Sequence, residues 1–123
     1  MYNPIRPGRA ERNPWRATLE SDQGIVYLYH YWCKKYLDKA AVLPSVRSHL
    51  TLVKQRVEPP NASAWGFRQG EYFSFQYEPI IHTGNGFYWL NVYSDPLNEI
   101  LIHLGLPPKH HFHLTVAKER EIA

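Results

Sequence analysis

The chain reads His49-Leu50-Thr51-Leu52-Val53-Lys54 at residues 49–54 and His113-Leu114-Thr115-Val116-Ala117-Lys118 at residues 113–118. Both stretches follow one pattern: a His, an apolar residue, a Thr, two aliphatic residues and a Lys. Alternation of apolar and polar residues, with many aliphatic or β-branched side chains, is typical of a half-buried strand. The repeat therefore predicts two similar strands, around which the rest of the chain is organised.

The same pattern predicts which face of each strand is polar. Side chains at positions i and i+2 of a strand point to the same face. His49 and Thr51 should therefore share one face, and His113 and Thr115 should do the same on the second strand. The apolar positions should face the core: Leu50, Leu52, Leu114 and Val116.

The lysines that end the two copies, Lys54 and Lys118, are candidate anion-binding residues. Each lies five positions after its His. In a regular strand this odd spacing turns the two side chains to opposite faces. Either Lys can reach the His face only where a β-bulge or the end of the strand interrupts the alternation.

Composition predicts one globular domain over residues 1–123, because 44% of the residues are hydrophobic and 15% aromatic. Fourteen Lys and Arg against 11 Asp and Glu give a formal charge of +3, which favours an anionic ligand without identifying it. The single cysteine, Cys33, excludes an internal disulfide and a Cys-based zinc site. No apolar run is long enough for a signal peptide or a membrane span, so we expect no membrane contact and a reducing, cytoplasmic compartment.

The chain before the first motif predicts an arm, a strand and a helix. Residues 1–14 combine arginines with prolines and predict a basic arm without regular structure, and residues 15–20 alternate weakly as a strand does. Over residues 23–41, apolar side chains recur at spacings of three and four and predict an amphipathic helix. Its predicted apolar stripe consists of Ile25, Leu28, Tyr29, Trp32, Cys33, Tyr36 and Leu37. The first motif strand should then run from about residue 46 to 55.

The region between the motifs predicts a loop, a hairpin and a second helix. Residues 56–69 contain loop-forming residues, and residues 71–81 and 87–93 read as strands joined by an Asn85-Gly86 turn. Asp95-Pro96 is typical of a helix start, and Gly105 of a helix end. The predicted order is strand, helix, motif strand, two-stranded hairpin, helix, motif strand.

Two sets of side chains alternate along residues 87–93. One set should pack under a helix: Tyr88, Leu90 and Val92. The other should share the face of the His strands: Phe87, Trp89, Asn91 and Tyr93. The aromatic members of the second set can stack on a nucleobase, or they can fill an interface between two halves of the protein, and both interpretations stay open.

With these features, the chain resembles the 2H phosphoesterases, the superfamily of RNA-ligase-like and cyclic-nucleotide phosphodiesterases named for two His-x-Thr/Ser motifs. The resemblance covers roughly residues 15–118. It implies an α+β fold with two lobes, whose antiparallel sheets are related by an approximate twofold axis around a central cleft, with the helices outside. It implies catalytic roles for His49, Thr51, His113 and Thr115, and Lys118 stands where such proteins often carry an Arg. The shortened second half departs from the family pattern.

The activity implied by the resemblance is hydrolysis of a cyclic phosphate, such as a 2′,3′-cyclic phosphate at an RNA or nucleotide end. One His would take a proton from water and the other would protonate the departing ribose oxygen. The two Thr hydroxyls would hydrogen-bond the non-bridging oxygens. This scheme needs no cofactor and no metal.

Two other functions stay open. The same four residues could act on a cyclic di- or oligonucleotide signal, or the chain could be a non-catalytic RNA- or nucleotide-binding module, although a pure binder does not need two equivalent imidazoles. The cluster of His110, His111 and His113 suggests a metal, but no Cys or carboxylate pattern completes a ligand set, so we expect none. The sequence does not reveal the oligomeric state or which His is the base.

Overall fold

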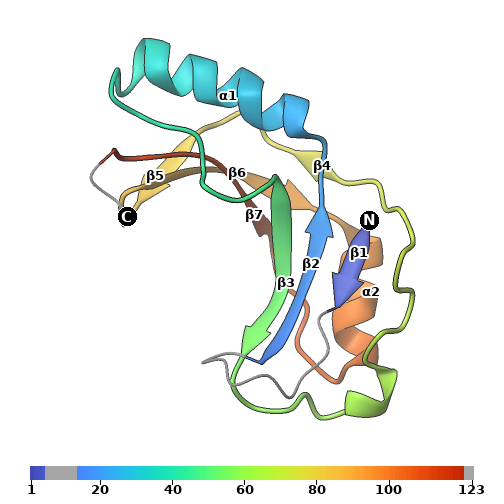
Figure 1. Ribbon diagram of the computed structural model, residues 1–123. Helices are drawn as coiled ribbons and strands as arrows, with labels where there is room; N and C mark the ends of the chain where they lie inside the picture. The colour runs from blue at the N-terminus through green and yellow to red at the C-terminus, as the bar shows by residue number, and fades with distance from the viewer. Residues whose placement is uncertain (5–13, 121–123) are drawn as a thin grey trace.

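The computed structural model describes residues 1–4 and 14–120. These residues form an α+β structure in which a curled antiparallel sheet carries two helices (Figure 1). The elements in chain order are β1 (Tyr2–Pro4), β2 (Trp15–Glu20), α1 (Gln23–Tyr36), β3 (His49–Gln55), a 3₁₀ turn (Ala62–Ala64), β4 (Gln76–Tyr77), β5 (His82–Gly84), β6 (Phe87–Tyr93), α2 (Asp95–His103) and β7 (Phe112–Lys118). The α+β class is thereby confirmed, as are the strand predicted over residues 15–20 and both motif strands.

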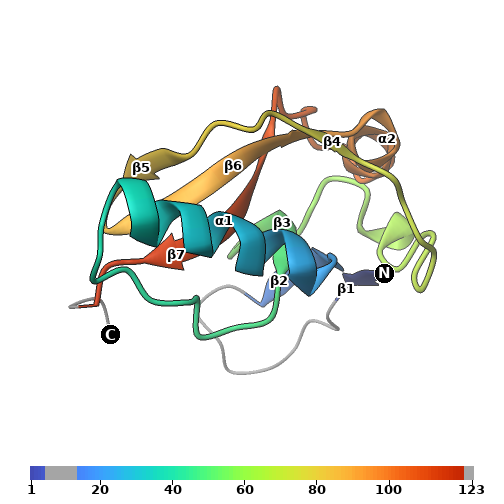
Figure 2. The same ribbon diagram turned by 90° about the horizontal axis from the view of Figure 1, so that it is seen from above.

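The sheet brings the two motif strands together although 64 residues separate them in sequence. Its strand order is β1-β2-β3-β7-β6-β4, with β5 also paired to β6. All of these pairings are antiparallel. Strands β3 and β7, which carry the repeat, are thus neighbours at the centre of the sheet. Figure 2 shows the loop that leads from α1 back to β3.

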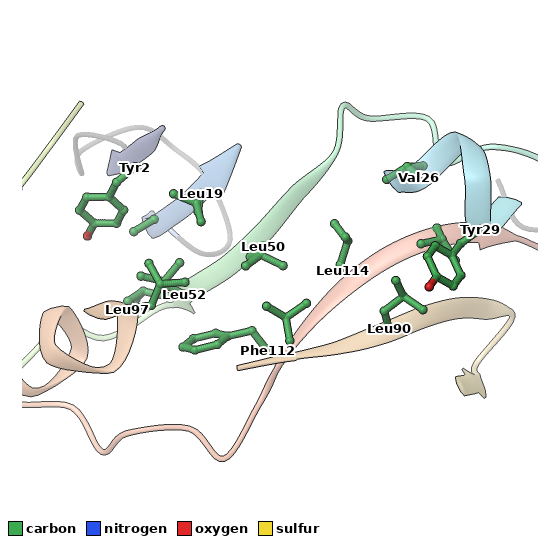
Figure 3. Close-up of a cluster of buried hydrophobic side chains, with 14 of the residues drawn as sticks. Tyr2, Leu19, Val26, Tyr29, Leu50, Leu52, Leu90, Leu97, Phe112 and Leu114 are labelled. Atoms are coloured by element: carbon green, nitrogen blue, oxygen red, sulfur yellow. The ribbon is translucent and has the colours of Figure 1, made fainter. Parts of the chain in front are cut away.

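The core lies between the sheet and the two helices. Helix α1 packs against β7, and α2 packs against β3. Figure 3 shows Val26 and Tyr29 of α1 at the end of the core that also holds Leu114 and Leu90, whereas Leu97 of α2 lies at the end that holds Leu52. As predicted, the apolar positions of the repeat are buried, together with alternate residues of β6: Leu50, Leu52, Leu114, Val116, Tyr88, Leu90 and Val92.

Helix α1 is shorter than predicted and buries a different stripe. It begins after Asp22, whose side chain accepts a hydrogen bond from the Gly24 N–H, and it ends at Tyr36 rather than at residue 41. Its buried residues are Val26, Tyr29 and Cys33. The helix meets the sheet along this narrow row, so four members of the predicted stripe are exposed: Leu28, Trp32, Tyr36 and Leu37.

The N-terminus is also more ordered than predicted. Tyr2–Pro4 pairs with β2, and the Tyr2 side chain is buried. The prediction of an irregular arm is therefore wrong for residues 2–4, because burying Tyr2 and pairing with β2 favour a strand there. Residues 5–13 of the predicted arm lie outside the described residues.

The strand predicted over residues 71–81 is reduced to Gln76–Tyr77. The chain at residues 70–71 bonds to β1 instead, since Gly70 N–H donates to Tyr2 O and Tyr2 N–H donates to Glu71 O. The preceding loop is packed as well as irregular, with Trp65 in an edge-to-face contact with Trp15 at 5.0 Å. The alternation in this segment is therefore a poor guide, because residues 70–71 bond to β1 and only Gln76–Tyr77 pair with β6.

The hairpin and the second helix form where the turn signals predict them. Asn85 and Gly86 both have positive φ, 52° and 82°, as the two central residues of a type I′ turn require. Helix α2 is capped by Ser94, one residue before the predicted Asp95. Neither helix of the described residues is long and apolar enough to cross a membrane.

Candidate functional site

The four motif side chains lie beside one another on the helix-free face of the sheet. Leu50 of β3 is paired with Leu114 of β7 in an antiparallel ladder. Leu50 with Leu114 is the one residue pair that joins β3 and β7 among the described residues, so both motifs lie where these two strands come together.

These four side chains line one open depression of about 410 Å³. The other residues around it are Lys54, Lys109, His111 and Phe112. The depression therefore combines imidazoles, hydroxyls and amines, and no acidic residue is among the described residues that line it. Its composition suits a small anion.

A β-bulge in β3 turns Lys54 toward this depression. Thr51 pairs with Thr18 and Val53 pairs with Ala17, so Leu52 is an extra residue in the ladder with β2. Leu52 and Val53 are both buried, and the alternation resumes one position later. Lys54 consequently shares the face of His49.

Strand β7 carries a bulge at the equivalent position of the repeat. Thr115 pairs with Trp89 and Ala117 pairs with Tyr88, which leaves Val116 as the extra residue. Val116 and Ala117 are both buried, and Lys118 returns to the His face. The β-bulge that either Lys needs in order to reach the His face is thus present in both motif strands.

A second hollow of about 230 Å³ adjoins the depression, because His49 and Thr115 line both. Residues 44–47, Phe87 and Lys118 complete its walls. Phe87 and Lys118 are cross-strand partners, so an aromatic ring and an amine lie side by side there. A ring of a ligand can stack on Phe87 while the Lys118 ammonium pairs with an anionic group next to it.

The His49 ring is oriented by the backbone. Its Nδ1 lies 2.8 Å from the carbonyl oxygen of Arg47 and must donate to it, since a carbonyl only accepts. Nε2 is then the nitrogen presented to the depression. The chain just before the ring is anchored on α1, where Ser48 N–H donates to the Gln23 side chain at 2.9 Å.

The His113 ring is held in a stack of aromatic rings. It lies between Trp89, at 4.7 Å and 22°, and His111, at 5.1 Å and 16°. Its Nε2 is 3.2 Å from Nε2 of His111, so only one of these nitrogens can carry the shared proton. Partial desolvation lowers the pKa of His113, and repulsion from His111, His82 and Lys109 lowers it further.

Trp89 supports the His113 ring and is itself in contact with His82. The His82 ring centroid lies 6.0 Å from that of Trp89, and the Trp89 Nε1–H donates to Asn91 Oδ1 at 3.1 Å. The Asn91 amide donates in turn to His82 Nε2. These contacts hold Trp89 in place beside His113, whereas Phe87 is an exposed ring at the rim of the second hollow.

Tyr93 lies farther along the same face and outside both hollows. Its hydroxyl donates to the Glu78 carboxylate, which raises the pKa of Tyr93. Its ring contacts His110 and His111 edge-on. The structure does not bring Tyr93 to the motif residues as it does Phe87, Lys54 and Lys118.

Sequence reasoning missed several residues of the site. His111 lies two positions before His113, so the strand period could have placed it on the same face. Lys109, whose pKa is lowered by desolvation, is positioned by two hydrogen bonds between its backbone and the Asn98 side chain of α2. No local pattern predicts that contact, nor the place of His82 behind Trp89.

The described residues contain no group of three or more His, Cys, Asp or Glu side chains arranged to hold a metal ion. His111 and His113 approach each other as a pair, and His110 turns its ring edge-on to His111 at 5.7 Å. His30 of α1 lies apart from this cluster, with its Nε2 3.1 Å from the Ala41 carbonyl oxygen.

Comparison of the chain with protein-family models, curated proteins and solved structures finds no match. The resemblance to the 2H phosphoesterases therefore rests on the two motifs and on what surrounds them.

Proposed function

We propose that this chain is a metal-independent phosphodiesterase of the 2H type, which hydrolyses a 2′,3′-cyclic phosphate at an RNA or nucleotide end. One observation carries the proposal: two His-x-Thr strands with the same bulge lie side by side and line one basic depression. Imidazole pairs serve as base and acid in phosphodiester hydrolysis at neutral pH. Lysines brought to the same face by the bulges supply the positive charge that a cyclic phosphate needs.

The proposal includes the two-lobed symmetry that such a fold implies. One half would be β2-α1-β3 and the other β6-α2-β7, each a strand, a helix and a motif strand. The packing supports this division, since each helix crosses to the motif strand of the other half, α1 to β7 and α2 to β3. The approximate axis would then pass between Leu50 and Leu114.

Within this mechanism we assign the base to His113. Its environment favours the neutral imidazole, because a second proton would face His111 and Lys109. A neutral His113 would take a proton from the attacking water at Nε2, once the water replaces His111 as the hydrogen-bond partner of that nitrogen. The bond from water oxygen to phosphorus then forms as the bond to one ribose oxygen breaks.

His49 would then be the acid that protonates the departing ribose oxygen. Its Nδ1–H stays with the Arg47 carbonyl, so the transferable proton of the imidazolium is on Nε2. Thr51 and Thr115 would donate to the non-bridging oxygens as negative charge develops on them. Lys54 and Lys118 would neutralise the phosphate from either side.

The proposal is tested by incubating the protein with 2′,3′-cyclic mononucleotides, with an RNA ending in a 2′,3′-cyclic phosphate and with cyclic dinucleotides, all in excess EDTA. We expect conversion of the 2′,3′-cyclic substrates to phosphomonoesters, and no loss of rate with EDTA. His103→Ala is the matched control, since His103 lies on α2 and its ring contacts Phe67.

Other outcomes separate the alternatives. Turnover of cyclic dinucleotides alone would move the proposal to signalling nucleotides. Binding of RNA without turnover of any substrate would favour the non-catalytic module. Activity that EDTA abolishes and zinc or manganese restores would contradict metal independence and point to the His110–His113 segment.

A further inference from the structure

Helix α1 leaves three tyrosines exposed. Tyr27, Tyr31 and Tyr36 are 55%, 56% and 71% exposed. Tyr27 and Tyr31 are four positions apart, so their side chains are neighbours on one outward helix face, with Cβ atoms about 5–6 Å apart, whereas Tyr36 points to another side of the helix. No element among the described residues covers Tyr27 and Tyr31, although exposed aromatic rings so close together are unusual for a solvated face.

Three lysines lie near these tyrosines, at the C-terminal end of α1 and just after it. Lys34, Lys35 and Lys39 follow Tyr31, and the Lys35 ammonium lies 5.8 Å from the Tyr31 ring centroid and 5.3 Å from that of Tyr36. Tyr31 and the three lysines line a shallow hollow of about 260 Å³. None of these lysines forms an ion pair with a described residue, so their charge is available to a ligand.

The charge of this face is of one sign. Residues 23–36 contain no Asp or Glu. The first carboxylate after them, Asp38, is engaged by the Tyr88 hydroxyl at 3.0 Å and by the Ala40 N–H at 3.0 Å. A ligand along residues 23–36 therefore meets aromatic rings and positive charge, with the carboxylates of Asp22 and Asp38 only at the two ends of the helix.

This face is continuous with the candidate active site. Tyr27 lines a hollow of about 330 Å³ together with residues 43–47. Residues 44–47 also form a wall of the hollow that contains His49, Thr115 and Lys118. A chain of adjoining hollows therefore leads from α1, past the exposed Arg47, to the motif residues.

We infer that the outward face of α1 binds the single-stranded RNA that leads to the cyclic phosphate. Bases stack on Tyr27 and Tyr31, and Lys34, Lys35 and Arg47 neutralise the phosphates between them. Single-strand binding sites elsewhere combine these two elements, a basic track and aromatic rings. A protein partner fits less well, because lysines are depleted from the centres of protein interfaces.

The inference rests on the proposed function for the direction of the RNA, and it adds a substrate class. The preferred substrate is an RNA of several nucleotides with a cyclic end. A 2′,3′-cyclic mononucleotide fills only the hollows around the motif residues and makes no contact with α1. The enzyme should therefore have a lower KM for the oligonucleotide than for the mononucleotide.

Binding is measured apart from catalysis, with a fluorescent single-stranded RNA that ends in a 3′-phosphate and cannot be hydrolysed further by this reaction. We expect Tyr27→Ser with Tyr31→Ser to weaken binding about twentyfold or more, because each of the two stacked bases contributes about fivefold or more. Lys34→Gln with Lys35→Gln should lower the slope of log Kd against log salt by about 1.4, or about 0.7 for each phosphate that a lysine no longer neutralises. Tyr72→Ser and Arg56→Gln, which change an exposed tyrosine and an exposed arginine elsewhere, should have no effect.

Catalysis gives the second readout. On an RNA with a cyclic end, the α1 variants should raise KM with little change in kcat, and on the cyclic mononucleotide they should match the unaltered protein. RNA binding that the α1 variants weaken, in a protein with no turnover, would contradict the proposed function and support the inference.

Three results would overturn the inference. They are no RNA binding by the unaltered protein, equal RNA affinity in the α1 variants, and a change of oligomeric state in these variants by sedimentation, which would make α1 a contact between copies of the chain. Circular dichroism of each variant establishes that the helix is retained. The substituted side chains are exposed, so the fold should tolerate the changes.

Discussion

The two motif strands have the same geometry and different surroundings. In β3 and in β7 the residue after the Thr is an extra residue, two consecutive aliphatic side chains are buried, and a Lys returns to the polar face. His49, however, is held by one backbone carbonyl, whereas His113 is held by rings on both sides. The repeat thus specifies where the imidazoles are, and their neighbours specify what each can do.

In the proposed mechanism this difference matters, because base and acid must hold different protonation states in one complex. Two identical environments would give two histidines with the same preference. The stack with His111 and Trp89 disfavours a charged His113, and no comparable ring stack surrounds His49 in the described part of the chain. Asymmetry around a symmetric pair is a general way to separate the pKa values of two catalytic groups.

The largest expected effect comes from removing either imidazole. His49→Ala and His113→Ala should each lower kcat on a cyclic phosphate by about 10²–10⁴, the usual contribution of one general acid or base. The double variant should be scarcely slower than either single one, because the two residues act as a unit. Retention of near-normal rates by both single variants, with RNA binding intact, would show that the repeat is structural and would favour the binding module.

The next effect concerns the hydroxyls, which sharpen the comparison between the strands. Thr51→Val and Thr115→Val keep the β-branched shape and remove one donor each. We expect losses in kcat of about tenfold, below the 10²–10³ found for a sole oxyanion donor, because the lysines can replace part of the interaction. Thr115 lines both hollows and Thr51 only one, so Thr115→Val should cost more. Equal rates in both variants and the unaltered protein would exclude a role for the hydroxyls.

Much of this arrangement could be predicted from sequence because it is local. The period of two placed Leu50 and Leu114 in the core, and Asn85-Gly86 predicted a hairpin turn that the positive φ angles confirm. The position of the bulges could not be predicted, because a bulge depends on how the neighbouring strand pairs. It was recognised only as a condition for Lys54 and Lys118 to reach the site.

The failures have a common physical origin in long-range contacts. Apolar periodicity overestimated the length of α1, and it could not tell which of several apolar rows the sheet would cover. Tyr2–Pro4 forms a strand because it pairs with β2, and no pattern in residues 1–14 predicts that contact. The support of His113 by Trp89 likewise depends on the alignment of β6 with β7.

The smallest expected effect tests the cause of the asymmetry. His111→Gln removes one charge that lowers the pKa of His113, so that pKa should rise toward its ordinary value of 6.5 and the acid limb of the pH–rate profile should move to higher pH. The same pKa shift predicts how the stability of the fold depends on pH. The folded pKa of His113 lies below 6.5, so the unfolded chain binds more protons and stability falls as pH decreases from 6.5 through the folded value. His111→Gln should make this fall shallower, and because His113 is exposed, screening should limit the difference in Tm to about 1–2 °C. Thermal melts between pH 7 and pH 5 measure it, with His103→Gln as the matched control. An acid limb that stays in place in His111→Gln would show that desolvation, together with the charges of His82 and Lys109, sets the protonation of His113, and that His111 does not make the difference between the two motif strands.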